Sequence, residues 1–161
     1  MPEAEGLVKQ DLGRRLVAVM FTDMVGYTAL FQADERLAMD KHDRYTRAID
    51  RHHEAFGGTI VQRLGDGSMS MFPGALVAVH EIVDAAAQLS AQEPDRWFDL
   101  GVGVHAGEAV ETAEGFIGTA VNVAARVCAA ARPGEVLVTS TVRASRRRAS
   151  PPASSLVAGG A

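Results

Sequence analysis

The feature that most constrains the fold is an apolar run from Leu16 to Phe21, which is followed at once by the carboxylate of Asp23. Because this run is rich in valine, it predicts a buried β-strand that extends from about Arg15 to Phe21. A short segment with one glycine, Gly26, comes next, and a helical pattern follows it. A strand that delivers an aspartate to a tight turn can hold a divalent cation, whereas the same aspartate could instead cap the helix.

A second aspartate, Asp66, lies in a turn between two predicted strands, 58–64 and 68–72. Asp-Gly favours a hairpin because glycine accepts a positive φ, and turn formation alone would explain the residue. A central strand and a neighbouring hairpin can also bring Asp23 and Asp66 side by side. The repulsion between two close carboxylates is removed when they share a cation, so a metal site is the alternative interpretation.

The remaining pattern alternates helices with strands. A helix is predicted from Asp34 to Phe56 and is expected to end at Gly57 and Gly58, since glycine favours helix C-termini. His42, His52, His53 and His105 are expected to be structural, because no Cys or Glu partner is arranged with them. The other expected elements are a helix at 75–92, a strand at 98–104, a polar connector at 111–115, a helix from a Thr119 cap to about Ala131 and a strand at 135–139. The order βαββαβ is the ferredoxin-like plan, which serves many functions.

Composition and charge narrow the class of protein. A chain of 161 residues with 47% hydrophobic residues suits one domain with a real core. The net charge of −4 argues against a nucleic-acid partner, and no apolar run is long enough to span a membrane. The single cysteine, Cys128, excludes an internal disulfide, which is consistent with a cytoplasmic location. We expect a flexible leader at 1–13, a catalytic domain at 14–142 and a disordered basic tail rich in Pro, Ser and Ala at 143–161.

Four segments in this order resemble the class III adenylyl/guanylyl cyclase catalytic domain. They are Phe21–Thr28, Arg63–Gly67, Gly101–Glu108 and Gly118–Arg126. The resemblance spans about Arg14 to Thr141 and is specific because all four segments occur together. It implies an α+β fold of the ferredoxin-like βαββαβ type, an antiparallel sheet with helices packed on it, assembled as a cyclase-type homodimer. It also implies that a nucleoside triphosphate is converted to a 3′,5′-cyclic nucleotide and pyrophosphate in intracellular signalling.

The resemblance assigns roles to residues of this chain. It implies that Asp23, Asp66 and the backbone carbonyl of Met24 hold two divalent cations, Mg²⁺ or Mn²⁺. It implies that Asn122 orients the ribose and that Arg126 stabilises charge on the α-phosphate. Because the family builds each site from two chains, a homodimer would contain two shared sites and a monomer would be inactive. The segment implied to bind phosphate is Val25, Gly26, Tyr27 and Thr28.

Base recognition is where the sequence departs from the family. The family's usual adenine-reading Lys and Asp correspond to Gln62 and Gly115, and Arg63 is expected on the opposite face of its strand. Gln62 has donors and acceptors for a base edge, and with this single reader discrimination is expected to be modest. ATP is favoured over GTP because of its cellular abundance and the habit of the family. A catalytically weak or inactive cyclase-like module that binds nucleotide or a partner chain is the competing hypothesis. A ferredoxin-like domain of unrelated function is a third.

Overall fold

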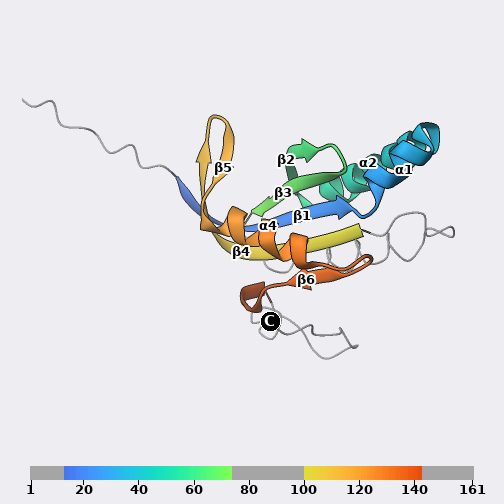
Figure 1. Ribbon diagram of the computed structural model, residues 1–161. Helices are drawn as coiled ribbons and strands as arrows, with labels where there is room; N and C mark the ends of the chain where they lie inside the picture. Colours follow the sequence, from blue (N-terminus) through green and yellow to red (C-terminus); the bar gives the residue numbers. More distant parts are fainter. Residues whose placement is uncertain (1–12, 74–99, 143–161) are drawn as a thin grey trace, which may run out of the picture.

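The computed structural model describes residues 13–73 and 100–142 (Figure 1). Three predicted segments fall wholly or almost wholly outside these ranges: the leader at 1–13, the helix at 75–92 and the tail at 143–161. The described elements are β1 (Arg14–Met24), α1 (Tyr27–Ala33), α2 (Glu35–Phe56), β2 (Thr59–Leu64), β3 (Gly67–Pro73), β4 (Leu100–Thr112), β5 (Gly115–Ile117), α4 (Thr119–Ala130) and β6 (Val136–Val138).

The strands form one sheet in the order β2-β3-β1-β4-β5, and β6 also pairs with β4. This arrangement confirms an α+β fold with helices packed on a sheet. The β1–β3, β1–β4, β2–β3 and β4–β5 pairs are antiparallel, as expected, but β4 and β6 are parallel. The sheet is therefore mixed: it is antiparallel as expected except at the β4–β6 pair, where the chain crosses over through α4 before it returns as β6 (Figure 1).

The strand β4 is longer than the sequence indicated. It pairs with β1 from Leu100, opposite Met24, to Val110, opposite Arg14. It then turns directly into β5, with Thr112 opposite Gly115. The predicted polar connector at 111–115 is therefore wrong, and its residues belong to a β-hairpin. Pairing along the full length of β1 extends β4, since a neighbouring strand supplies partners for every backbone group.

The two faces of the sheet carry two separate apolar clusters. Along β1, Ala18, Met20 and Met24 join a cluster with Tyr45 and Ile49 of α2. The alternate residues of β1, Val17 and Val19, point to the opposite face of the sheet and belong to a second cluster, because side chains in a strand alternate between faces. That second cluster joins β1 to α4, and its buried members are Val17, Val19, Met69, Met71, Ala109, Ala120 and Ala124.

The helix α2 begins and ends at the predicted residues. The Asp34 side chain accepts a hydrogen bond from the Leu37 backbone N–H at 3.0 Å, which caps the first turn. Gly57 ends the helix in the left-handed conformation at φ 69°, where a glycine avoids the steric cost of a Cβ. The predicted cap at Thr119 is wrong, because the N-cap of α4 is Gly118 and no side chain caps that helix.

Glycines let α4 lie close to the sheet. A Cβ on Gly103 of β4 would collide with the backbone N and Cα of Cys128 in α4. The helix presents Ala120, Ala124 and Cys128 to the sheet, one residue every four. Small residues on both surfaces therefore allow the backbones to approach closely, and α4 is fixed tightly over β4.

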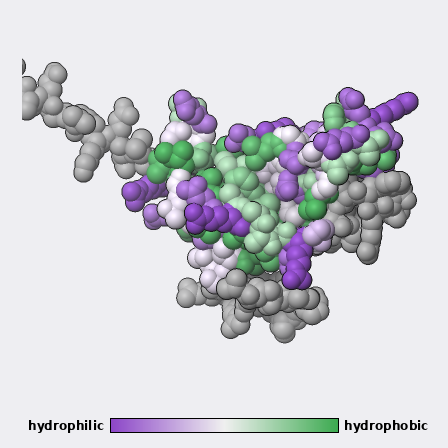
Figure 2. Space-filling model, viewed as in Figure 1, coloured by the Kyte–Doolittle hydropathy of each residue, from purple (hydrophilic) through white to green (hydrophobic). Residues whose placement is uncertain are grey.

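Figure 2 shows the molecule from the same side as Figure 1. Hydrophobic residues occupy much of the centre of this face, whereas hydrophilic residues gather over α1 and α2. Within residues 13–73 and 100–142, no helix combines the length and apolar character needed to cross a membrane.

Candidate functional site

The structure brings Asp23 and Asp66 together. Asp23 lies near the end of β1 opposite Gly67, the first residue of β3. The backbone N–H of Met24 donates a hydrogen bond of 2.7 Å to the carbonyl of Asp66, which ties the turn to the strand end. Partial burial raises the pKa of the Asp23 carboxyl, and the charge and hydrogen bonding of the Asp66 carboxyl raise it further. The two side chains are therefore close enough to repel when both are ionised.

Backbone packing explains why this pair can form. A Cβ on Gly67 would collide with the backbone carbonyl of Thr22, so only glycine lets β3 approach β1 beside Asp23. Asp23 is not a helix cap, since Gly26 occupies the N-cap of α1 and no side chain caps that helix. The alternative in which Asp23 serves only as a cap is therefore wrong.

The predicted phosphate segment lies between β1 and α1. Gly26 has φ 80° and ψ 8°, a left-handed conformation that suits glycine. Its carbonyl accepts the hydrogen bond of the Leu30 N–H at 3.0 Å, which is the first bond of the helix. The N–H groups of Tyr27 and Thr28 thus precede the first intrahelical donor, and Val25 is half-buried just before them.

Asn122 and Arg126 lie on the outward side of α4. Both side chains are exposed, and each is two residues away from the buried stripe of Ala120, Ala124 and Cys128. Two residues correspond to about 200° around a helix, so these side chains point away from the sheet that carries Asp23. The chain does not bring its Asn/Arg pair to its own aspartates.

A β-bulge determines where Gln62 points. The register between β2 and β3 shifts between Ile60 and Gln62, so Val61 is the extra residue. Gln62 is exposed and lies opposite Met69, whose side chain belongs to the cluster under α4. Gln62 therefore shares the α4 face of the sheet with Asp23, because paired residues point to the same side.

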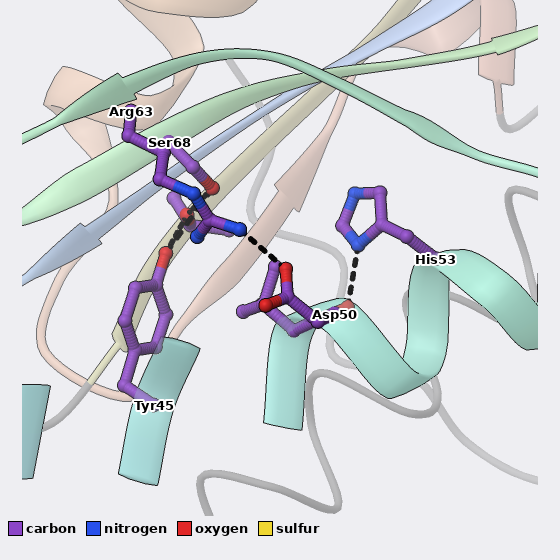
Figure 3. A network of polar contacts seen from close by, with 7 residues as sticks. Tyr45, Asp50, His53, Arg63 and Ser68 are labelled. Atoms are coloured by element: carbon purple, nitrogen blue, oxygen red, sulfur yellow. Dashed lines mark hydrogen bonds and ion pairs between the residues drawn. The ribbon is translucent and has the colours of Figure 1, made fainter. Parts of the chain in front are cut away.

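Gly115 lies near the bulge in β2, whereas Arg63 points away from it. A Cβ on Gly115, which has φ 126°, would lie 3.4 Å from the Val61 side chain. The two predicted base-reading positions are thus neighbours in space, although Gly115 offers no side chain. Arg63 forms an ion pair with Asp50 of α2 (Figure 3), which confirms that it points to the opposite face.

Two histidines of α2 bond to backbone carbonyls. The Nε2 of His42 is 2.7 Å from the Gly65 carbonyl, and the Nδ1 of His53 is 2.6 Å from the Ile49 carbonyl (Figure 3). On β4, the Nδ1 of His105 is 2.8 Å from the hydroxyl of Thr139. These contacts confirm structural roles for all three side chains.

The donor set at the aspartate pair fits a hard divalent cation. Carboxylate oxygens are the ligands that Mg²⁺ and Mn²⁺ prefer, and Mg²⁺ sites commonly combine one or two carboxylates with substrate phosphates. In the part of the chain that the structure describes, no group of three or more His, Cys, Asp or Glu residues could hold a metal. A cation at Asp23 and Asp66 would therefore need further oxygen ligands, which a triphosphate supplies.

Sequence reasoning missed a group of hydroxyls beneath the aspartates. Thr22 of β1, Tyr45 of α2 and Ser68 of β3 are buried and hydrogen-bonded to one another. Figure 3 shows Tyr45 pointing from α2 toward Ser68 on the sheet. The three residues are 23 and 46 positions apart along the chain, so no local pattern joins them. The only signal was a tyrosine on the apolar stripe of α2, since a buried phenol requires a hydrogen-bond partner.

Comparison with known proteins agrees with this fold. Residues 12–151 match the model of the adenylate and guanylate cyclase catalytic domain, and the chain therefore belongs to this family. It is 32% identical over 144 residues to a putative adenylate cyclase 3 of Rhizobium meliloti, covering 84% of this chain and 24% of that protein. It is 32% identical over 133 residues to a pH-sensitive adenylate cyclase of Mycobacterium tuberculosis, covering 81% of this chain and 32% of the other.

Solved structures show the same architecture. The adenylate/guanylate cyclase/hydrolase from Silicibacter pomeroyi superposes with a TM-score of 0.72 at 29% identity, covering 87% of this chain and 85% of that one. The adenylyl cyclase CyaB from P. aeruginosa superposes with a TM-score of 0.68 at 23% identity, covering 85% and 83%, and supports the fold alone. The chain spans about a quarter to a third of the length of the two curated relatives.

Proposed function

We propose that this chain is the catalytic domain of a nucleotidyl cyclase that converts ATP to 3′,5′-cyclic AMP and pyrophosphate, with GTP as the alternative substrate. The observation that carries the proposal is the juxtaposition of Asp23 and Asp66 at the end of β1 and the start of β3. Family membership supports the reaction class, and two relatives are named adenylate cyclases.

In the proposed reaction the ribose 3′-oxygen attacks the α-phosphorus, the bond to the β-phosphate oxygen breaks, and pyrophosphate leaves. Two Mg²⁺ or Mn²⁺ ions, when bound, neutralise the triphosphate and lower the pKa of the 3′-hydroxyl. Asp23, Asp66 and the Met24 carbonyl hold these cations in the proposal. The segment from Val25 to Thr28 supplies backbone N–H groups to the phosphates.

A second copy of the chain completes the site in this proposal. Because Asn122 and Arg126 point away from the aspartates of their own chain, they can serve only the aspartates of another chain. The helix α4 carries one charged residue, Arg126, among alanines and valines, which suits a surface buried by a partner. Asn122 then orients the ribose, and Arg126 stabilises the charge that develops on the α-phosphate.

The experiment is a cyclase assay with purified protein, Mn²⁺ and either ATP or GTP, in which the cyclic product is measured. We expect Asp23→Ala to abolish activity and Arg126→Ala to lower it by about 10²- to 10³-fold. An equal mixture of the two variants should recover about a quarter of wild-type activity, since half of the dimers are mixed and each mixed dimer has one intact site. Product formed equally well by Asp23→Ala contradicts the metal site, and a mixture that stays inactive contradicts the shared site.

One observation favours the second candidate, a weakly active or inactive module that binds nucleotide or a partner chain. Gly115 has no side chain to read the base, and Gln62 is exposed on its strand. The same assay separates the candidates. Nucleotide binding that depends on Asp23 but yields no cyclic product, with either ATP or GTP, supports the module over the enzyme.

A further inference from the structure

Three buried hydroxyls lie directly beneath the aspartate pair, and we call them the hydroxyl ring: Thr22, Tyr45 and Ser68. The Thr22 and Ser68 oxygens are 2.8 Å apart, the Tyr45 and Ser68 oxygens are 3.2 Å apart, and Thr22 is also hydrogen-bonded to Tyr45. All three residues are at most 5% exposed. Since each hydroxyl can donate one bond and accept another, the ring satisfies all three without water.

The ring is joined to both aspartates through the backbone. Thr22 directly precedes Asp23, Ser68 is two residues after Asp66, and Thr22 and Ser68 are paired across β1 and β3. Neighbouring side chains in a strand point to opposite faces, so the Thr22 hydroxyl faces α2 while the Asp23 carboxylate faces the α4 side. The phenol of Tyr45 therefore ties β1 and β3 together from the face opposite the carboxylates.

The helix α2 makes a second tie to the same turn. His42 lies three residues before Tyr45, so the two side chains are on one face of the helix. The Nε2 of His42 is 2.7 Å from the carbonyl of Gly65, the residue before Asp66. The His42 ring also contacts Tyr27 of α1, with ring centroids 5.8 Å apart.

We propose that the hydroxyl ring is a positioning device that fixes the separation of the Asp23 and Asp66 carboxylates and thereby sets their affinity for a divalent cation. Two like charges at the end of one strand and the start of another push these backbones apart when no cation is present. The ring opposes this movement, so the pair stays ready to bind. This inference rests on the proposed function, because it assigns Thr22, Tyr45 and Ser68 to that metal site.

The test measures Mn²⁺ binding from the electron paramagnetic resonance signal of free Mn²⁺, with 3′-deoxy-ATP present as a ligand that cannot cyclise. Because the triphosphate binds Mn²⁺ by itself, the protein's uptake is the further loss of signal relative to the same mixture of Mn²⁺ and nucleotide without protein. Thr22→Val keeps the shape of the side chain but removes the hydroxyl, and Thr22→Ser keeps the hydroxyl. We expect Thr22→Val to weaken Mn²⁺ binding about tenfold, as loss of a supporting contact does in other metal sites. Thr22→Ser should stay near the wild-type affinity.

Two serines of β3 provide a matched control. Ser68 and Ser70 are both buried on the α2 face, but the Ser70 hydroxyl has no hydrogen-bond partner among the described residues. Ser68→Ala should therefore weaken Mn²⁺ binding about as much as Thr22→Val, and Ser70→Ala should leave it unchanged. Circular dichroism and thermal melting of each variant establish that it is folded at the temperature of the titration.

The outcomes separate this inference from the proposed function. If wild type and Asp23→Ala take up Mn²⁺ equally, the metal site and the role of the ring are both overturned. If wild-type binding depends on Asp23 but folded Thr22→Val and Ser68→Ala bind as tightly as Ser70→Ala, the ring has no positioning role. If the ring variants fail to fold while Ser70→Ala folds, the ring is a stability element alone and the proposal is overturned.

Discussion

The helices α2 and α4 pack on opposite faces of the sheet and differ in the side chains that they direct toward it. The helix α2 directs polar groups inward, where Tyr45 bonds to the sheet, His42 bonds to the Gly65 carbonyl and Arg63 reaches back to Asp50. The helix α4 directs small apolar residues inward and its polar pair, Asn122 and Arg126, outward. Under the proposed function, α2 supports the aspartates of its own chain, whereas α4 holds Asn122 and Arg126 for the aspartates of another chain.

This difference predicts that Arg126→Ala removes activity without removing stability. Because Arg126 is exposed and its guanidinium is proposed to stabilise transition-state charge, turnover should fall by about 10²- to 10³-fold. The melting temperature should stay within a degree or two of wild type, since exposed side chains contribute little to folding. Cyclic product formation and thermal melting are the two measurements.

The control for Arg126 lies on the other helix. Arg44 of α2 is also exposed and pairs with Asp40 at 3.0 Å, four residues earlier. Arg44→Ala should change neither activity nor stability by much, since an exposed pair of this kind is worth about 0.3–0.5 kcal/mol. Equal losses of activity in both variants would mean that charge in general, and not the position on α4, is what matters.

The inward face of α4 is tested by glycine substitutions in β4. Gly103→Ala would drive a Cβ into the backbone of Cys128, so we expect it to destabilise the fold by about 3 kcal/mol. Gly101→Ala is the matched control, because its Cβ would lie 3.7 Å from the Ala131 Cβ, an ordinary contact. Chemical denaturation of both variants makes the comparison, and similar stabilities would contradict close packing of α4.

These two helices also show what the sequence could and could not predict. The length of α2 was predictable, because its stripe and its Asp34 and Gly57 ends are local signals. The close approach of α4 at Gly103 was not, since it depends on which strand lies under the helix. The β4–β5 hairpin was missed for a similar reason, because its strand is extended by pairing with β1.

In the candidate site too, features with local sequence signals could be predicted, and features that depend on contacts between distant segments could not. Asp23 and Asp66 were predicted as neighbours because each lies in a recognisable strand or turn motif, and the structure brings them together. The bulge at Val61 was not predictable, because it arises from a register shift between paired strands. The hydroxyl ring was also beyond the sequence, since it needs three elements to meet.

A substitution of Asp23, near the end of β1, is expected to change stability less than Gly103→Ala does. Since partial burial and, after it, the charge of Asp66 raise the pKa of the Asp23 carboxyl, the ionised pair destabilises the metal-free protein at neutral pH. Asp23→Asn should therefore raise metal-free stability by about 0.5 kcal/mol, a value reduced by solvent screening. It should also abolish the rise in melting temperature that Mn²⁺ gives wild type. A variant less stable than wild type without metal would show that the carboxylates do not repel.

The smallest effect concerns His105, which lies on the α4 side of β4 and bonds to Thr139. Burial lowers the pKa of His105 below its usual value of 6.5, so the folded state binds this proton less readily than the unfolded chain does. Its contribution to stability is therefore fully present above pH 6.5 and is lost as the pH falls through the folded-state pKa. The raised pKa of Asp23 acts in the opposite direction: its contribution is fully present below its usual value of 3.8 and is lost as the pH rises through its folded-state pKa. Urea denaturation of wild type and His105→Gln between about pH 7.5 and 5.5 measures how the free energy of unfolding depends on pH. We expect this dependence to be weaker in the variant than in wild type. Parallel slopes would mean that His105 titrates alike in both states and that its contact with Thr139 is open to water.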